Sequence, residues 1–199
     1  LPGLIELHTD NLDKFFTPRP KVDWPAHSAM SSHDALMVAS GITTVLDAVA
    51  IGDVRDGGDR LENLEKMINA VEETQKRGLN RAEHRLHLRC ELPHHTTLPL
   101  FEKLVDREPV SLVSLMDHSP GQRQFARIEK YREYYQGKYA LTNEEMVRYE
   151  EEQRQLAAQW SQPNRLSIAA MCRDRNIALA SHDDATHEHV RESHQLGSV

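Results

Sequence analysis

The sequence contains no apolar run that approaches the roughly 20 residues needed to span a bilayer. Its first residues show no basic region followed by a signal-type apolar core. It has only two cysteines, Cys90 and Cys172, which lie far apart without CxxC spacing, so we expect two reduced thiols and not a disulfide framework. These features favour a soluble, cytoplasmic protein.

The sequence also lacks an excess of positive charge. Its net charge is −7, whereas nucleic acids and anionic membranes are bound by basic patches that release counterions. We therefore expect neither a nucleic acid nor a membrane as a partner. We find no internal repeat, low-complexity segment or glycine-rich phosphate loop, so an anionic ligand would have to meet cationic side chains.

The 199 residues are enough for one domain with a sizeable core. The expected strands cover residues 4–7, 42–49, 84–92, 110–116 and 177–181. The expected helices cover about 32–40, 59–77, 98–106, 165–175 and 187–196. This alternation predicts βαβ units and a parallel sheet. A complete (β/α) barrel needs about eight such units and typically ~250 residues, so we expect an incomplete TIM-like barrel of about five strands over residues 1–199.

Two segments interrupt the alternation. Residues 125–161 turn charged and helical, with a tyrosine cluster and with Thr142 and Glu145 as a capping box, and predict an inserted helical hairpin. A solvated helical excursion and a partner-binding surface both explain it. Residues 11–26 predict a long loop punctuated by prolines. Its cations Lys14, Arg19 and Lys21 either meet phosphate oxygens from a lid or are simply solvated.

Side chains suited to metal binding follow four of the five expected strands. They are His8 with Asp10, then Glu91, then Asp117 with His118, and finally His182 with Asp183 and Asp184. Ligands gather at the carboxyl ends of parallel strands, and imidazole with carboxylate suits zinc and similar divalent ions. The pattern, together with twelve histidines in the chain, predicts a polynuclear metal site. A plainer explanation remains for each residue: a strand-end histidine can be a satisfied polar neighbour, and Asp183 or Asp184 can cap the next helix.

These positions resemble the amidohydrolase superfamily, in which a first-strand His pair, a Glu or carboxylated Lys and two later His surround one or two metals. Longer segments resemble the phosphonate-metabolism branch of that superfamily. They are residues 8–14, 17–20, 116–122 and 180–186. The resemblance runs over essentially the whole chain. It implies a ligand set for one or two divalent ions, expected to be zinc, that consists of His8, Asp10, Glu91, His118 and His182.

The resemblance implies metal-dependent hydrolysis of α-D-ribose 1-methylphosphonate 5-triphosphate to the 5-phosphate, with release of pyrophosphate, in the carbon–phosphorus lyase pathway. Asp10 and Asp183 are then the expected catalytic carboxylates. The expected ligands of the phosphorylated sugar substrate are Lys14, Arg19 and Lys21. A superfamily relative that cleaves amide or amine bonds is the nearest alternative, and a non-enzymatic interaction element is another.

The chain departs from the superfamily pattern in two places. Asp10 stands where the second first-strand His would be, and the last-strand Asp that usually accepts a proton from water has no counterpart. The chain therefore resembles a central piece of the enzyme. We expect this piece to lack turnover by itself and, because its sheet would have unpaired edges, to form homo-oligomers or aggregates.

Overall fold

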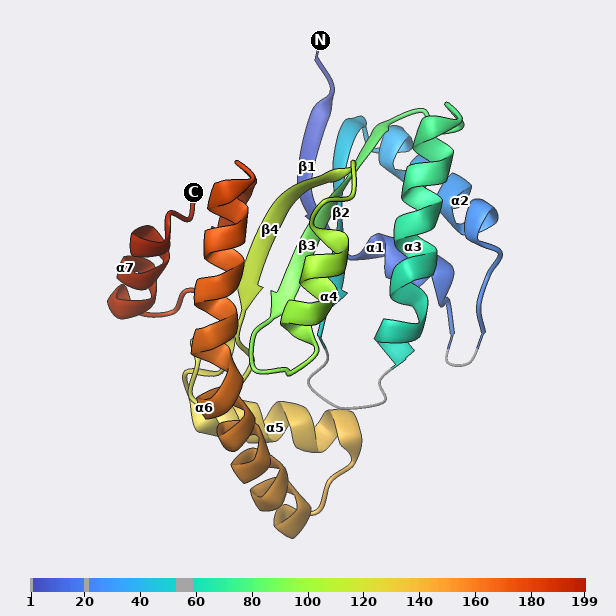
Figure 1. The fold of residues 1–199 in the computed structure, drawn as a ribbon. Coiled ribbons are helices and arrows are strands. Elements are labelled where there is room, and N and C mark those ends of the chain that lie inside the picture. The colour runs from blue at the N-terminus through green and yellow to red at the C-terminus, as the bar shows by residue number, and fades with distance from the viewer. Residues whose placement is uncertain (1, 20–21, 53–58) are drawn as a thin grey trace. The chain divides into compact units, whose positions relative to one another are not determined.

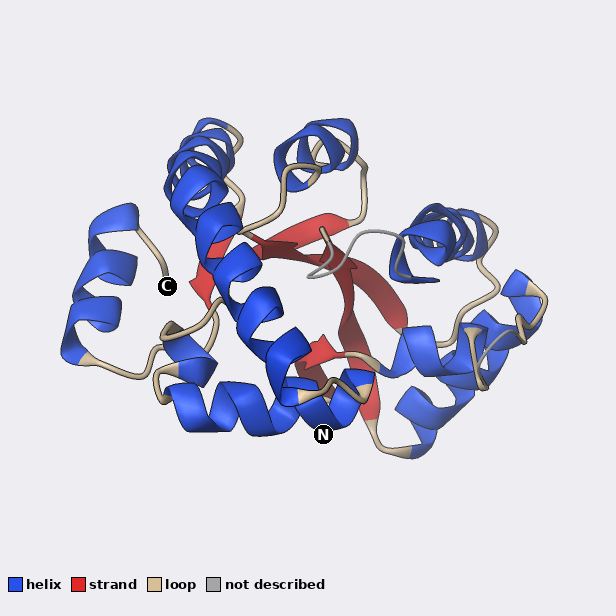
Figure 2. Cartoon of the chain, turned by 90° about the horizontal axis from the view of Figure 1, so that it is seen from below, coloured by secondary structure: helices blue, strands red, loops and turns tan. Residues whose placement is uncertain are grey.

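The computed structural model describes residues 2–19, 22–52 and 59–199. At least one helix separates each strand from the next along the chain (Figures 1 and 2). The strands are β1 (Leu4–Thr9), β2 (Ile42–Ile51), β3 (Glu83–Glu91), β4 (Val110–Met116) and β5 (Ala178–Ser181). They form one sheet in the order β1-β2-β3-β4-β5, in which β1 runs parallel to β2. The predicted α/β class and strand number are confirmed, whereas the likeness to part of a barrel stays a prediction.

The helices follow the same alternation. They are α1 (Asn11–Phe16), α2 (Ala26–Ala39), α3 (Asp59–Lys76), α4 (Thr97–Leu104), η1 (a 3-10 turn, Arg123–Phe125), α5 (Ile128–Tyr139), α6 (Asn143–Asp174) and α7 (His187–Leu196). The elements divide into two compact units. The first unit holds β1, α1, α2, β2, α3, β3 as far as Arg89, the end of α4 and the start of β4. The second unit holds the ends of β3 and β4, the start of α4, and everything from residue 114 onward.

In the first unit the core is built around β2. Its residues from Val45 to Val49 are all buried, as expected of a β-branched and apolar strand covered on both faces. Helices α2 and α3 contact each other and pack against β2 (Figure 1). Gly41, at φ +80°, makes the left-handed turn that ends the α2 region and leads into β2.

Strand β1 forms an edge of the sheet and is largely uncovered. It pairs with β2 from Leu4 opposite Ile42 to Thr9 opposite Asp47. Its apolar side chains Leu4, Ile5 and Leu7 are 58–65% exposed. An exposed apolar edge strand is a surface on which further chain can pack.

In the second unit the inserted helices have their own core. Thr142 and Glu145 form the predicted capping box at the start of α6, with both reciprocal hydrogen bonds present. Phe125, Tyr131, Tyr135 and Met146 pack together and are buried. These four side chains pack within the insertion, which favours the solvated helical excursion over a partner-binding surface.

Three expectations about the helices were wrong. Residues 11–16 form the short helix α1 and not a loop. Helix α2 begins at Ala26 and not near residue 32. Pro25, with a φ of −55°, precedes it, and the Pro25 carbonyl accepts the first helical hydrogen bond. Helix α6 continues through Pro163 to Asp174, so no separate helix starts near residue 165. No helix in the described ranges is long and apolar enough to cross a membrane.

Candidate functional site

In the second unit, the ends of β3 and β4 are joined by a pair of predicted site residues. Glu91 closes β3, and His118 follows β4 by two residues. The backbone N–H of His118 donates to Oε1 of Glu91 at 3.0 Å, and Nδ1 of its ring lies 2.5 Å from Oε2. Two contacts to one carboxylate fix both the backbone and the ring of His118. The carboxylate is buried, whereas the His118 side chain is 17% exposed.

The end of β5 brings the next pair into the same group. His182 Nδ1 lies 2.6 Å from Oδ2 of Asp183, and the same oxygen lies 3.9 Å from Nε2 of His118. The side chains of His182 and Asp183 are 22% and 36% exposed, so the group is open to solvent on one side. Asp183 adopts φ +61°, in the left-handed region that most residues avoid. Such backbone persists only where the surroundings hold it.

The donor set of this group fits a divalent metal ion. One ligand atom from each of His118, His182 and Asp183 lies within 4.8 Å of the others. Two imidazoles and a carboxylate are the ligand types that zinc takes in catalytic sites, which keep one position open. The structure therefore brings Glu91, His118, His182 and Asp183 together. Asp184 lies outside the group, since its carboxylate accepts from Ser181 Oγ and pairs with Arg123.

The end of β1 lies in the first unit, with the other two predicted ligands. His8 Nε2 is 3.8 Å from Oδ2 of Asp10, so the two side chains converge as the strand alternation predicts. Nη1 of Arg89 lies 2.5 Å from Oδ1 of Asp10. His87 packs edge-on against His8 and contacts the carbonyl of Leu7 through Nδ1 at 3.1 Å. Asp10 is therefore paired with a cation as well as with a candidate ligand.

Arg89 is a residue that the sequence-based prediction missed. It stands two positions before Glu91 and so shares its face of β3. That spacing is the signal that could have identified it. Together with Lys14, Asp10 and Asp13 it lines a cavity of about 210 Å³.

The predicted substrate-binding cations have different surroundings. Lys14 is exposed on α1 and lines the cavity beside Arg89. Arg19 is exposed, and its backbone forms an isolated antiparallel β-bridge with Val22. Lys21 lies outside the described residues.

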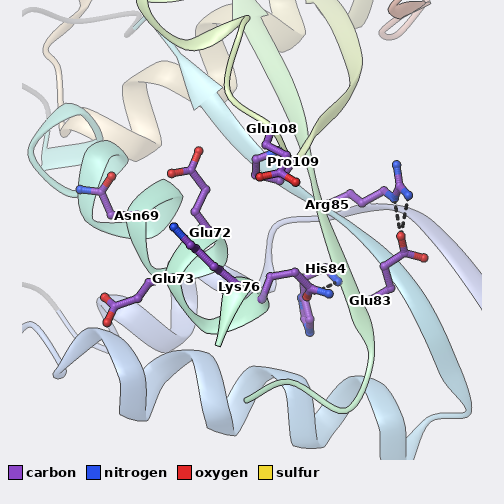
Figure 3. Close-up of a pocket in the computed structure, with 10 residues that line it drawn as sticks. Asn69, Glu72, Glu73, Lys76, Glu83, His84, Arg85, Glu108 and Pro109 are labelled. Carbon is purple, nitrogen blue, oxygen red and sulfur yellow. Dashed lines mark hydrogen bonds and ion pairs between the residues drawn. The ribbon is translucent and has the colours of Figure 1, made fainter. Parts of the chain in front are cut away.

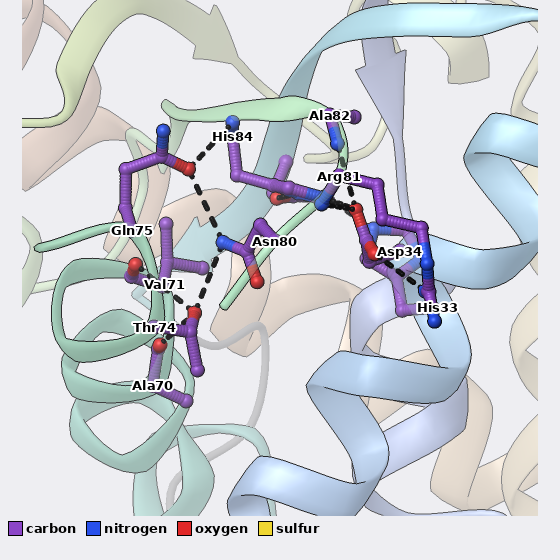
Figure 4. A network of polar contacts seen from close by, with 11 residues as sticks. His33, Asp34, Ala70, Val71, Thr74, Gln75, Asn80, Arg81, Ala82 and His84 are labelled. Atoms are coloured by element: carbon purple, nitrogen blue, oxygen red, sulfur yellow. Dashed lines mark hydrogen bonds and ion pairs between the residues drawn. The ribbon is translucent and has the colours of Figure 1, made fainter. Parts of the chain in front are cut away.

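A second group of potential ligands is buried in the first unit (Figure 4). His33 Nε2 lies 2.5 Å from one carboxylate oxygen of Asp47, and His84 Nδ1 lies 2.7 Å from the other. His84 Nε2 then reaches Asp34 at 3.3 Å. Asp34 accepts the backbone N–H groups of Arg81 and Ala82. These contacts form a continuous hydrogen-bonded chain that ties α2 to β2 and β3, so the group is explained as part of the core.

The two carboxylates in this hydrogen-bonded group, Asp34 and Asp47, have lowered pKa values. Burial by itself raises the pKa of Asp47, but hydrogen bonds from His33 and His84 outweigh it, so the pKa lies below the usual value. For Asp34, burial is again the largest single influence and raises the pKa. The backbone N–H groups of Ala82 and Arg81 and the contact with His84 together outweigh that effect. Both side chains are therefore stabilised as carboxylates.

An open cavity of about 1030 Å³ lies elsewhere in the first unit (Figure 3). It is lined by the carboxylates of Glu72, Glu73, Glu83 and Glu108, and by Lys76 and Arg85 among others. It adjoins the beginning of β3, the opposite end from Glu91. None of the predicted site residues lines it, so we do not assign the site to this cavity.

The fold and the site describe an α/β protein whose imidazole and carboxylate side chains gather at strand ends. Among known proteins, the chain is similar to the alpha-D-ribose 1-methylphosphonate 5-triphosphate diphosphatase of Escherichia coli (strain K12), with 89% identity over all 199 residues. The chain spans 53% of the length of that protein. No protein-family model matches the chain, and no solved structure matches it.

Proposed function

We propose that this chain belongs to a metal-dependent diphosphatase that hydrolyses α-D-ribose 1-methylphosphonate 5-triphosphate to the 5-phosphate and pyrophosphate. The observation that carries the proposal is the 89% identity, over every part of the chain, to a protein named for that reaction. The group of His118, His182 and Asp183 at strand ends supports the metal dependence.

The proposed metal ligands are His8 and Asp10 in the first unit, and Glu91, His118 and His182 in the second unit. The proposed ion is zinc, in one or two copies. When bound, such an ion polarises a phosphoryl oxygen and lowers the pKa of water. Glu91 orients the ring of His118 through their 2.5 Å contact, a role that carboxylates commonly play beside ligating histidines.

Asp183 lies among the potential ligands, but we assign it proton transfer and not metal binding. Its Oδ2 is held by His182 at 2.6 Å, and its side chain is open enough for water to reach it. Asp10 is the second proposed catalytic carboxylate, and its contact with Arg89 keeps it oriented. General acid–base groups of this kind typically contribute about 10²- to 10⁴-fold in rate.

The substrate carries a triphosphate, and the proposed cations that bind it are Lys14, Arg19 and Lys21. An arginine can hold a phosphate through two parallel hydrogen bonds, whereas a lysine acts as a point charge. The exposed positions of Lys14 and Arg19 leave them accessible to such a ligand.

The test is a product analysis of a protein of the relative's full length that contains this sequence. The proposal expects pyrophosphate release from the triphosphate, with activity lost when a chelator removes the metal. Release of ammonia from a nucleobase, or of a carboxylate from an amide, without pyrophosphate from the triphosphate would replace this proposal by the amide-cleaving or deaminating alternative.

A further inference from the structure

We propose that Arg123 is a positioning residue that holds the loop carrying His182 and Asp183 in the conformation needed to bind the metal. The proposal rests on the proposed function, since it concerns the metal group of that site. Arg123 belongs to η1, after β4, and is not itself one of the metal-type side chains.

The Arg123 guanidinium is buried, at 2% exposure, and makes contacts on both sides of the two site residues. Nη1 donates to Oγ of Ser181 at 3.0 Å and also pairs with the carboxylate of Asp184. Ser181 directly precedes His182, and Asp184 directly follows Asp183. One guanidinium nitrogen therefore fixes the two ends of this short loop.

The loop backbone is irregular, so its side-chain contacts decide its conformation. Asp183 has φ +61°, and Arg123 itself has φ +42°. Among residues other than glycine, Asn and Asp adopt a left-handed conformation most readily, because their side chains bond locally, as Asp183 does with His182. Ser181 Oγ also donates to Oδ1 of Asp184 at 2.6 Å, which closes the loop on itself. Without Arg123, the carboxylate of Asp184 would lose this cationic partner.

A second buried arginine extends the support to the other histidine. Arg165 of α6 binds Glu192 through Nη1 at 3.0 Å and approaches Asp117 through Nη2 at 3.6 Å. Asp117 directly precedes His118. Nη2 of Arg123 reaches the same oxygen of Glu192 at 3.0 Å, so one carboxylate of α7 joins the two arginines. Burial, and then the nearby Arg165 charge, lower the pKa of Arg123, and Glu192 opposes both effects.

The geometry requires an arginine at this position. The planar guanidinium presents separate N–H groups toward the Ser181–Asp184 side and toward Glu192. A lysine keeps the charge but offers a single nitrogen, which cannot serve both sides at once. Arg123→Lys thus tests the bridging geometry and not the charge alone.

The experiment is a Co²⁺ titration of the full-length protein that contains this sequence and of its variants, followed by visible absorption. Partners that orient metal ligands typically contribute roughly 10- to 100-fold in metal affinity, and we expect Arg123→Lys to weaken Co²⁺ binding by that factor. The matched control is Arg132→Lys, which alters an arginine bound to Glu150 at 2.7 Å in the inserted helices. The control should leave the affinity unchanged.

The imidazole ¹⁵N signals of the metal-free full-length protein separate a positioning role from a general structural defect, when those of His182 are compared with those of the buried His33 and His84. Arg123→Lys should shift the His182 signals, because the residues on either side of His182 and Asp183 lose a partner, and should leave those of His33 and His84 unchanged. Arg132→Lys should shift neither set, and a shift of both sets in Arg123→Lys would mean a general structural defect and would overturn the positioning role. If Arg123 variants fail to fold, Glu192→Gln tests the positioning role in their place, since Glu192 is partly exposed and the substitution removes only one charge. It should weaken Co²⁺ binding in the same direction.

Two results have different meanings in this design. In the first result, His118→Ala and His182→Ala lose Co²⁺ binding but Arg123→Lys binds Co²⁺ as the parent does. This result would overturn the role of Arg123 alone, and Glu192→Gln takes the place of Arg123→Lys if that variant does not fold. Unchanged Co²⁺ binding in His118→Ala and His182→Ala would overturn the metal group itself, and the proposal for Arg123 with it.

Discussion

Nδ1 of His118 lies 2.5 Å from Oε2 of Glu91, while Nε2 of the same ring faces Oδ2 of Asp183 at 3.9 Å. One imidazole thus connects a buried carboxylate at the end of β3 with an accessible carboxylate after β5. Histidines that bind metals commonly use one nitrogen for the ion and give the other to a carboxylate. This relationship is the main structural reason to propose a metal site in the second unit.

We expect metal content to depend on the strand-end histidines. His182→Ala or His8→Ala should lower metal affinity roughly tenfold or more, because each removes a proposed ligand. His194→Ala is the control, since His194 is exposed on α7. The measurement is the zinc content per chain after dialysis against a fixed free zinc concentration. An equal loss in all three variants would mean that exposed histidines chelate the metal and that no built site exists.

Charge removal at Arg19 should mainly affect substrate binding in the full-length protein. A hydrogen bond to a charged group contributes about 1.5–3 kcal/mol, so KM for the triphosphate should rise roughly 10- to 100-fold in Arg19→Ala. Arg19→Lys should also be impaired, because it loses the second parallel hydrogen bond. Arg77→Ala, which removes an exposed arginine paired with Glu73, is the control for steady-state kinetics. Unchanged kinetics in Arg19→Ala would mean that the loop is only solvated.

The buried hydrogen-bonded side chains of Asp34, His84, Asp47 and His33 should make the free energy of unfolding depend on pH. The folded pKa of Asp47 is lowered, so its contribution is fully present above the unfolded value of about 3.9 and is lost as pH falls toward the folded pKa. Asp47→Asn should cost about 1–3 kcal/mol in free energy of unfolding near neutral pH, because it leaves one of the buried hydrogen-bonding groups around Asp47 without its partner.

Urea unfolding between neutral pH and about pH 3 measures this effect. The slope of stability against pH should be shallower in Asp47→Asn than in the parent. Asp23→Asn, which changes an exposed carboxylate bound to Lys66, should leave the acid slope nearly as in the parent. Identical acid slopes for Asp47→Asn and the parent would show that this carboxylate contributes nothing to acid stability.

The β1 edge should drive self-association of the 199-residue chain. Ile5 is 65% exposed on that strand, and a lysine there would introduce charge into the exposed apolar edge. We expect sedimentation analysis to show oligomers or aggregates in the parent, with negligible turnover, and a shift toward monomer in Ile5→Lys. Val147→Lys, at a similarly exposed position on α6, should not cause the shift. A monomeric and fully active parent chain would contradict this prediction.

Sequence patterns located the regular elements well where local signals agreed. Strand β4 is an apolar run bounded by breakers, and its predicted range equals the observed Val110–Met116. Helix α7 was predicted over residues 187–196, which is its observed range, and Gly197 ends it in a left-handed conformation. Helix α1 was missed because it is short and lies just before a proline-rich stretch, where its packing through Leu12 and Phe16 matters more than local propensity.

The site was partly predictable for a similar reason. Strand ends are visible in a sequence, and the structure brings Glu91, His118, His182 and Asp183 together from three of them. Arg123 was not predictable, because it enters from a turn between elements and meets its partners only through tertiary packing. The pairing of Asp10 with Arg89 likewise joins residues 79 positions apart, which no local pattern specifies.

The most direct test of the account is the identity of the phosphorus products formed by the full-length protein. With the ribose triphosphate as substrate, ³¹P NMR should show pyrophosphate and the 5-phosphate in equal amounts, and neither should form in His118→Ala or after chelation. Absence of pyrophosphate from a metal-loaded, folded protein, or undiminished pyrophosphate release in His118→Ala, would contradict it.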